Sequence, residues 1–308
     1  EFDFAPAAVD LFRDNYLEVG QNGAEPIEYP YAFIAPSNTG VPSGFDLDNN
    51  GTVGGGNDAL GFGAFPGQFG MLVLSKFPLG EARTFQNFRW QDLPGARLPA
   101  GGFYSPEELA VLPLSSKSHW DVPVTVAGRT VHVLASHPTP PTFDGPEDRN
   151  GLRNADEIAF WRLYVNGGPA AEALYDDTGA TGGLPSGECF VILGDQNSDP
   201  LDGDSLPGAA DQILTADRVI DAMPTSEGAV EAATTQGGNN TTHRGDPALD
   251  TADFSEPVPG NLRVDYVLPS HPLEVVGSGV FWPVAADPLS RLNDASDHHL
   301  TWVDLHVS

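Results

Sequence analysis

The sequence predicts an α+β domain in which helices and β-sheets form separate layers. Short apolar runs rich in β-branched and aromatic residues recur along the 308 residues, and Gly- and Pro-rich loops separate them, which is typical of strands. Stretches with helical spacing are scattered between these runs. No internal repeat, heptad pattern or linker divides the chain, so we expect a single domain over residues 1–308.

Helices are predicted where apolar residues recur every three or four positions. Val9, Phe12 and Tyr16 show this spacing near the start of the chain. The predicted helices cover residues 6–16, 106–112, 154–164, 208–215 and 217–223.

Strands are predicted from apolar runs bounded by Gly, Pro or polar residues. Two of these runs flank Gly128, which indicates a hairpin. The predicted strands cover residues 31–35, 67–75, 122–126, 130–135, 189–193, 262–268, 273–280 and 299–307.

The chain is strongly acidic, with 14 Lys and Arg residues against 43 Asp and Glu residues and a formal net charge of −29. This charge repels nucleic acid and anionic membranes, which argues against tight, non-specific binding to duplexes. Chemistry on a phosphate group would require a divalent cation, because the protein has few positive groups of its own. Solubility, or adaptation to a salty or calcium-rich medium, is an alternative explanation of the acidity.

No apolar run approaches the roughly 20 residues that cross a bilayer, so we expect no membrane span. The single cysteine, Cys189, excludes an internal disulfide. Low lysine content, many Gly and Pro residues and long loops are compatible with a secreted protein, either extracellular or periplasmic. We expect the protein to be a monomer.

Polar side chains that bind metals or transfer protons interrupt or flank four of the predicted strands. These residues are His137, Asp195, Asn197, Asp265, Asp297 and His298. We expect the fold to bring them into a common site, because strand ends are where such groups meet.

The residue types suggest separate roles. Asp195 and Asn197 offer carboxylate and amide oxygens, which suit magnesium, calcium or manganese, and the amide could instead orient an attacking water. The alternative is a turn capped by Asx side chains. Asp265 lies within a predicted strand and requires a partner. That partner is either His298, which it would orient as a general acid–base, or Arg263 in a structural ion pair.

Residues 46–58 form a second candidate metal site. Asp46, Asp48 and Asn50 precede a glycine and match the first half of a calcium-binding loop. Asn57 stands at the twelfth position, where a Glu is expected, and no amphipathic helices flank the loop, which excludes an EF-hand. The segment is either a structural calcium clip or an Asx- and Gly-rich turn that binds no ion.

Four motifs, in this order along the chain, resemble those of the endonuclease/exonuclease/phosphatase superfamily, which includes pancreatic-type deoxyribonucleases, abasic-site endonucleases, sphingomyelinases and inositol phosphatases. They are Ser-His-Pro at 136–138, Gly-Asp-Gln-Asn-Ser-Asp-Pro at 194–200, Arg-Val-Asp-Tyr-Val-Leu at 263–268 and Ser-Asp-His-His at 296–299. The resemblance implies the DNase I-like fold, a four-layer α/β/β/α sandwich of two mixed β-sheets.

The resemblance also implies roles for these residues. Asp195 and Asn197 would hold a metal or position the attacking water, and Asp297 would be a metal ligand or a base. His298, oriented by Asp265, would contact the phosphate in the transition state.

Further residues complete the expected site. By resemblance, His137 would be the family's other phosphate-facing histidine, and Glu1 would be the glutamate that binds the divalent ion. Arg149 and Arg153 follow His137 closely and are candidate phosphate-binding residues. The family has an earlier strand ending in an Asn metal ligand, which has no counterpart here. We therefore expect a chain truncated at its N-terminus that lacks the first strands of the family fold.

The sequence thus predicts a phosphoester hydrolase that depends on Mg²⁺ or Mn²⁺ and acts on nucleic acid or a small phosphate ester, with Ca²⁺ as a candidate structural ion in the 46–58 loop. An alternative from a different class is a non-catalytic, secreted calcium-binding module with the same fold. The two hypotheses differ in whether His298, Asp265 and Asp195 converge within hydrogen-bonding reach.

Overall fold

The structure, a computed structural model, describes residues 6–307 of the chain. Its residues divide into two units, the first comprising residues 1–137 and 167–188 and the second comprising residues 138–166 and 189–308. Each unit is considered by itself. The single domain expected from the sequence stays a prediction.

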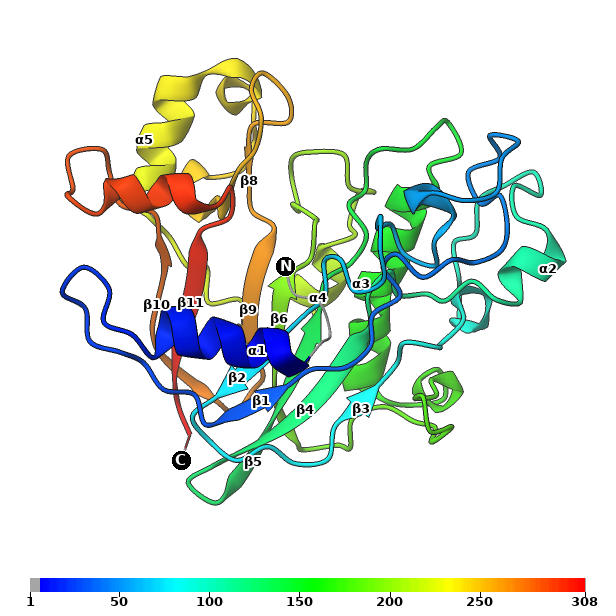
Figure 1. Cartoon of the computed structure of the whole chain (residues 1–308), viewed down its shortest axis with the longest axis horizontal. Helices are drawn as coiled ribbons and strands as arrows, with labels where there is room; N and C mark the ends of the chain where they lie inside the picture. The colour runs from blue at the N-terminus through cyan, green and yellow to red at the C-terminus, as the bar shows by residue number, and fades with distance from the viewer. Residues whose placement is uncertain (1–5, 308) are drawn as a thin grey trace. The chain divides into compact units, whose positions relative to one another are not determined.

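A long hairpin forms the main sheet of the first unit (Figure 1). β4 (His119–Val126) pairs with β5 (Arg129–Ser136) in antiparallel register, which confirms the predicted hairpin. Ala127 and Gly128 join the strands with φ angles of 51° and 83°, the left-handed geometry of a tight two-residue turn. β3 (Arg83–Thr84), which was not predicted, pairs with the other edge of β4.

The rest of the first unit consists of short elements. α1 (Pro6–Phe12) continues into η1 (Arg13–Leu17), and β1 (Tyr31–Phe33) pairs with β2 (Val73–Ser75). The predicted strand over residues 67–75 is shorter in the structure because Gly67 and Phe69, with φ angles of 90° and 62°, turn the chain before β2. The remaining elements are η2 (Gly56–Asp58), η3 (Trp90–Asp92), α2 (Pro106–Leu109) and η4 (Ala171–Ala173).

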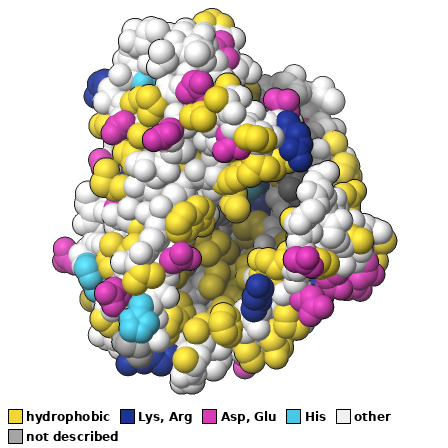
Figure 2. All heavy atoms as spheres, turned by 90° about the vertical axis from the view of Figure 1, so that its left-hand side faces the viewer, with side chains coloured by type: hydrophobic (Ala, Val, Ile, Leu, Met, Phe, Trp, Pro, Cys, Tyr) yellow, Lys and Arg dark blue, Asp and Glu magenta, His cyan; other side chains and the backbone are white. Residues whose placement is uncertain are grey.

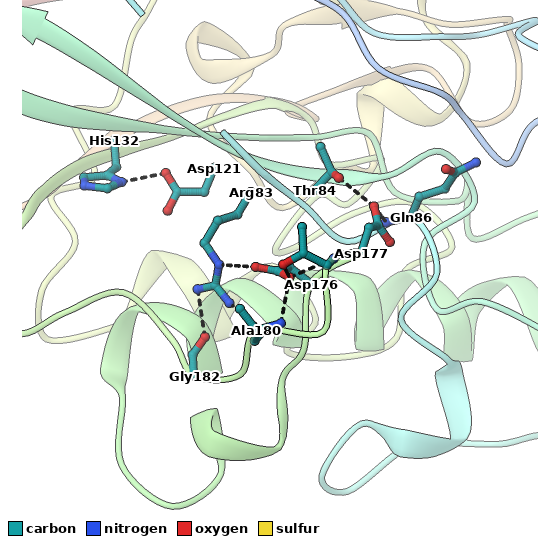
Figure 3. A network of polar contacts seen from close by, with 10 residues as sticks. Arg83, Thr84, Gln86, Asp121, His132, Asp176, Asp177, Ala180 and Gly182 are labelled. Atoms are coloured by element: carbon teal, nitrogen blue, oxygen red, sulfur yellow. Dashed lines mark hydrogen bonds and ion pairs between the residues drawn. The ribbon is translucent and has the colours of Figure 1, made fainter. Parts of the chain in front are cut away.

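Two adjacent aspartates fasten residues 167–188 to β3 within the first unit (Figure 3). Asp176 Oδ2 lies 2.7 Å from Arg83 Nε, and Asp177 accepts a hydrogen bond from Thr84 Oγ1 at 2.6 Å. The backbone nitrogen of Asp177 also donates to the Thr84 carbonyl at 2.8 Å. Hydrogen bonds to charged groups therefore hold this segment at the edge of the sheet.

The second unit contains the longest helix, α3 (Arg149–Asn166), which includes the predicted helix over residues 154–164. Its side chains Ile158, Phe160, Trp161 and Tyr164 are fully buried. The longer strands of this unit form antiparallel pairs. β6 (Cys189–Asp195) pairs with β9 (Asp265–Pro269), and β10 (Glu274–Phe281) pairs with β11 (Leu300–His306).

Shorter elements connect these strands. They are α4 (Asp211–Leu214), α5 (Glu227–Gln236), η5 (Gly238–Thr241), η6 (Pro247–Leu249), β7 (Ala252–Asp253), β8 (Asn261–Leu262) and η7 (Ser290–Ala295). α5 was not predicted, although Ser226 caps it by accepting a hydrogen bond from the Ala229 nitrogen at 3.2 Å. Ala229 packs with Val280 and Trp282, which joins the helix to the end of β10.

Two sequence predictions in this unit are corrected. Residues 217–223 are not helical. Val219 bridges Ser270, and the Ile220 nitrogen donates to the Pro269 carbonyl at 2.8 Å. This segment therefore lies beside the end of β9. The predicted strand over residues 262–268 is interrupted between β8 and β9, so Asp265 begins a strand instead of lying inside one.

Part of the surface of β10 and β11 is apolar and exposed. Val276, Leu300 and Trp302 are 63%, 70% and 41% exposed. Figure 2 views the side on which these strands lie in Figure 1 and shows hydrophobic side chains gathered there. In the described part of the chain, residues 6–307, no helix is long and apolar enough to span a membrane.

Candidate active site

Two carboxylates face each other where β6 ends and β9 begins. Asp195, the last residue of β6, is the antiparallel partner of Asp265, the first residue of β9. Their side chains are largely buried, with 14% and 19% exposed. Like charges directly opposite each other in a sheet are destabilising, so this pair requires a positive charge nearby.

His298 provides that charge. Its Nδ1 lies 2.9 Å from Oδ2 of Asp265, and its Nε2 lies 3.8 Å from Oδ2 of Asp195. Of the two partners that the sequence allowed for Asp265, the structure has the histidine, because the Arg263 guanidinium instead pairs with Asp221 at 2.5 and 3.0 Å. Asp195, Asp265 and His298 therefore converge.

The carboxylates favour the charged form of the imidazole. Burial lowers the pKa of His298, but the hydrogen bond with Asp265 and the negative charges of Asp265, Asp195 and Asp297 raise it, to about 9 overall. The Phe254 ring packs edge-on against the imidazole, with the ring centroids 5.4 Å apart. These contacts hold the ring of His298 in place beside the two carboxylates.

Thr251 positions Asp265 and was not identified from the sequence. Its hydroxyl donates to Asp265 Oδ2 at 2.9 Å and accepts hydrogen bonds from the backbone nitrogens of Val264 and Asp265 at 3.0 and 2.9 Å. The Thr251 carbonyl also accepts from the His299 nitrogen at 2.8 Å. Thr251 thus links the start of β9, which carries Asp265, to the segment that carries His298 and His299. No local sequence pattern identifies this threonine.

Hydrogen bonds from Asn154 of α3 fix the turn that carries Asn197. The Asn197 backbone, at a φ of 50°, donates to Asp195 Oδ1 at 2.7 Å, and its Nδ2 donates to the Pro138 carbonyl at 3.0 Å. Asn154 of α3, fully buried, donates from Nδ2 to the carbonyls of Gln196 and Thr139, both at 2.9 Å. Asn154 was also missed, although an Asn inside a helix is a recognisable signal.

Asp297 lies outside the convergent group. Residues 297–299 run beside β7, where His298 bridges Ala252. Side chains of an extended backbone alternate between two sides, so Asp297 and His299 point away from the side of His298. His299 accordingly stacks on Trp282, with centroids 3.7 Å apart, while Asp297 is exposed. Its role as a metal ligand stays a prediction.

The other predicted site residues belong to other elements. His137 follows β5 in the first unit, and Arg149 and Arg153 lie on α3 in the second. Arg149 pairs with Glu147, and Arg153 is buried. Glu1 lies outside the described residues. The functions assigned to these four residues stay predictions.

The 46–58 loop brings together Asp46, Asp48 and Asp58, with one carboxylate oxygen of each within 4.8 Å of the others. Asp58 was not a predicted ligand, although it follows the twelfth loop position. Its two oxygens accept hydrogen bonds from the nitrogens of Leu47 and Gly54, both at 2.7 Å. The Asn50 side chain contacts Asp48, and its Oδ1 accepts a hydrogen bond from the Thr52 nitrogen. The carboxylates thus organise a turn and also leave acceptor capacity for an ion.

The β6–β9 site has the donor types that a hard divalent cation requires. Asp195 and Asp265 each offer a carboxylate oxygen, and these oxygens lie within 4.8 Å of each other and of a ring nitrogen of His298. The unfavourable opposition of two carboxylates is itself relieved by a cation. The Asn197 amide adds a neutral oxygen two residues after Asp195. These residues therefore fit a Mg²⁺ or Mn²⁺ ion.

Comparison with known proteins gives the family. The sequence matches the Endonuclease/Exonuclease/phosphatase family over residues 4–298. No curated protein matches it. Similar solved structures include family proteins from Beutenbergia cavernae (18% identity, TM-score 0.49, 91% of this chain and 54% of that chain covered) and Leptotrichia buccalis (13%, 0.45, 90% and 72%). Sphingomyelinase C from Streptomyces griseocarneus is another (14%, 0.41, 98% and 80%).

The chain spans about half the length of the first of these structures, 54%. The family match covers almost the whole sequence, and the mixed strands and helices of the structure accord with a DNase I-like α+β fold. The chain has this fold and belongs to the endonuclease/exonuclease/phosphatase family.

Proposed function

We propose that the protein is a divalent-metal-dependent phosphoester hydrolase that acts through Asp195, Asp265 and His298. The observation that carries the proposal is the placement of one imidazole between two opposed carboxylates, at 2.9 and 3.8 Å. Asp–His pairing of this kind fixes the tautomer and the orientation of the ring, which is how a general acid–base or a phosphate-binding histidine is built. Membership of a family of phosphoester hydrolases supports the same chemistry.

In the proposed reaction, water adds to phosphorus, the bond from phosphorus to the leaving oxygen breaks, and the leaving alcohol gains a proton. Asp265 holds His298 through Nδ1, so the proton on Nε2 points toward the reacting group. His298 stabilises a phosphoryl oxygen or protonates the leaving oxygen. Asp195 and Asn197 orient the attacking water, and the Asp195 carboxylate accepts the proton that this water loses.

Asp195 and Asn197 would also hold the cation, with Asp297 and Glu1 as further proposed ligands. When bound, Mg²⁺ or Mn²⁺ supplies electrostatic stabilisation of the negative charge that develops on the phosphoryl group. The protein itself has a net charge of −29, so it contributes few positive groups to that task.

The proposed substrate is nucleic acid or a small phosphate ester. The acidic surface disfavours long duplexes and leaves single phosphodiesters and monoesters as the better candidates. His137, Arg149 and Arg153 are the proposed additional phosphate-binding side chains. We also propose that the protein is a monomer that acts outside the cytoplasm, in the extracellular space or the periplasm, in keeping with its composition.

The test is hydrolysis of bis-(p-nitrophenyl) phosphate and of p-nitrophenyl phosphate, with Mg²⁺, Mn²⁺ or Ca²⁺ and with chelator. We expect turnover that requires the cation and that falls at least about 100-fold in His298→Ala. His306→Ala is the matched control, since His306 also pairs its Nδ1 with a carboxylate, Glu274, at 3.2 Å, but on the exposed part of β11. The ratio of diester to monoester turnover separates nuclease-like from phosphatase-like action.

Turnover that survives in His298→Ala, or that does not respond to chelator, contradicts the proposal. Absence of turnover on both esters favours the second candidate function, a non-catalytic, secreted calcium-binding module. The grouping of Asp46, Asp48 and Asp58 is the observation that favours it. Calcium titration of the wild type and of Asp58→Asn tests the calcium clip: we expect the variant to lose one bound Ca²⁺, whereas equal binding would identify the loop as a turn without an ion.

A further inference from the structure

The second unit contains a cavity of about 80 Å³ that is separate from the residues of the proposed active site. Its lining residues are Asp202, Ala233, Asn240, His243, Gly245, Pro247 and Asp250. Two of these side chains are carboxylates, and they come from different segments. Asp202 lies on the loop after the β6 motif, and Asp250 follows η6.

Asp250 is buried in this cavity without a polar partner among the described residues. It is only 7% exposed, and within residues 6–307 no side chain or backbone group forms a hydrogen bond or ion pair with its carboxyl group. A buried carboxylate requires donors or a cation, and a buried neutral carboxyl group requires an acceptor. Residues 6–307 supply neither, and Asp250 lines the cavity.

The charges around Asp250 are negative. Burial, together with the charges of Asp199, Asp202 and Asp246, raises the pKa of Asp250 to about 8. The basic side chains of this region have other partners. Arg244 donates to the Leu201 carbonyl, Arg263 pairs with Asp221, and His243 shares a hydrogen bond through Nε2 with the Pro259 carbonyl.

Asp202 also lines the cavity, and backbone hydrogen bonds fix its carboxylate. Its two carboxylate oxygens accept hydrogen bonds from the backbone nitrogens of Arg244 and Gly245, at 2.8 to 3.0 Å. These bonds fix the carboxylate in place and use only part of its capacity, because each oxygen can accept two contacts. Asn240 adds an amide oxygen that accepts from the Asn261 nitrogen at 2.7 Å.

We propose that this cavity binds one hard divalent cation, Mg²⁺ or Ca²⁺, through the carboxylates of Asp202 and Asp250. Carboxylate and amide oxygens are the ligands such ions prefer, and the cavity has room for an ion that keeps several of its waters. The site is distinct from the metal site of the proposed function and does not depend on it.

The ion would tie together two segments that support the active site. Asp202 is five residues after Asn197, and Asp250 is adjacent to Thr251, whose hydroxyl holds Asp265. The cation site therefore has a positioning role, through the backbone that carries these residues.

Ion binding is measured by equilibrium dialysis and by thermal unfolding of the chelator-treated full chain, with Ca²⁺ and Mg²⁺ added separately. We expect Asp250→Asn and Asp202→Asn each to bind one ion fewer than the wild type. We also expect the ion to raise Tm by a few degrees in the wild type and by less in both variants. Asp246→Asn is the matched control, because this exposed carboxylate is near Asp250 but does not line the cavity.

A second measurement uses an otherwise intact cavity and does not depend on whether the cavity variants fold. In Asp195→Asn, which removes a ligand of the proposed active site, Mn²⁺ should broaden the NMR signals of the His243 ring at substoichiometric concentrations. Unchanged His243 signals, or equal ion counts in the wild type and Asp250→Asn, would overturn the proposal and show that Asp250 is a protonated group facing water. Because this readout does not involve hydrolysis, it is independent of the outcome for the proposed enzyme activity.

Discussion

His298 Nδ1 lies 2.9 Å from Asp265 Oδ2, although the two residues are 33 positions apart in the sequence. The same imidazole has Asp195 Oδ2 3.8 Å from its Nε2. Asp265 therefore orients the imidazole through Nδ1, and Nε2 faces Asp195 on the other side of the ring.

Replacement of Asp265 by Asn tests this relationship. We expect the pKa of His298 to fall from about 9, because the main hydrogen bond and the nearest negative charge are both lost. The measurement is an NMR titration of the His298 ring in metal-free protein. Asp304→Asn on β11, an exposed substitution with the same change of charge, should leave the titration near its wild-type position. An unchanged pKa in Asp265→Asn would contradict the pairing.

Thr251 should matter for both stability and turnover. Thr251→Val keeps the shape but leaves the Val264 and Asp265 nitrogens without their acceptor, so we expect a loss of about 1–3 kcal/mol in the free energy of unfolding. In the proposed enzyme, kcat should fall more than KM rises, because Asp265 loses a fixed position. Thr251→Ser retains the hydroxyl and is the control. Equal effects of Ser and Val would show that the methyl group, and not the hydrogen bonds, is important.

Asp250 predicts a dependence of stability on pH. Its pKa is raised from 3.8 to about 8, so the folded protein holds this proton more tightly than the unfolded chain. The contribution is fully present below about pH 4 and is lost as the pH rises through about 8. In chelator, we expect the free energy of unfolding to decline over this range less steeply in Asp250→Asn than in the wild type. Parallel curves from denaturant titrations at several pH values would contradict this expectation.

The same analysis applies to His298 in a higher pH window. Its raised pKa contributes stability below about pH 6.5 that is lost as the pH rises through about 9. The Asp250→Asn protein should therefore still lose stability above neutral pH. A double variant with His298→Ala should show a smaller loss there.

The contacts of Asp177 predict a local effect in the first unit. Its carboxylate accepts hydrogen bonds from Thr84, from the Gln86 nitrogen, and from both the backbone and side chain of Asn87. We expect Asp177→Ala to reduce the free energy of unfolding by about 1–2 kcal/mol, since several exposed donors exchange a charged acceptor for water. Asp177→Asn, which keeps one acceptor oxygen, should cost less. Hydrogen exchange should show faster opening of residues 167–188 in the Ala variant, and unchanged exchange there would show that other contacts hold the segment.

The elements that the sequence predicted correctly depend on local patterns. The β4–β5 hairpin follows from two β-rich runs around Gly128, and α3 follows from apolar residues at helical spacing. The prediction of a helix over residues 217–223 is wrong because backbone hydrogen bonds to Pro269 and the neighbouring bridge to Ser270 outweigh local propensity. α5 was missed because its Ala- and Thr-rich sequence has only a weak apolar periodicity, and packing of Ala229 against Trp282 stabilises it.

By itself, the sequence determined the family resemblance and the residue types of the candidate site, because the motifs at Asp195, Asp265 and His298 are short and contiguous. It left open whether Asp265 pairs with His298 or Arg263, and it gave no reason to single out Thr251 or Asp250. Only the tertiary structure decided these points. Each point depends on which side chains are in contact across strands and loops that are distant in sequence. These contacts determine the hydrogen bonds of each polar group, its burial and the charges near it.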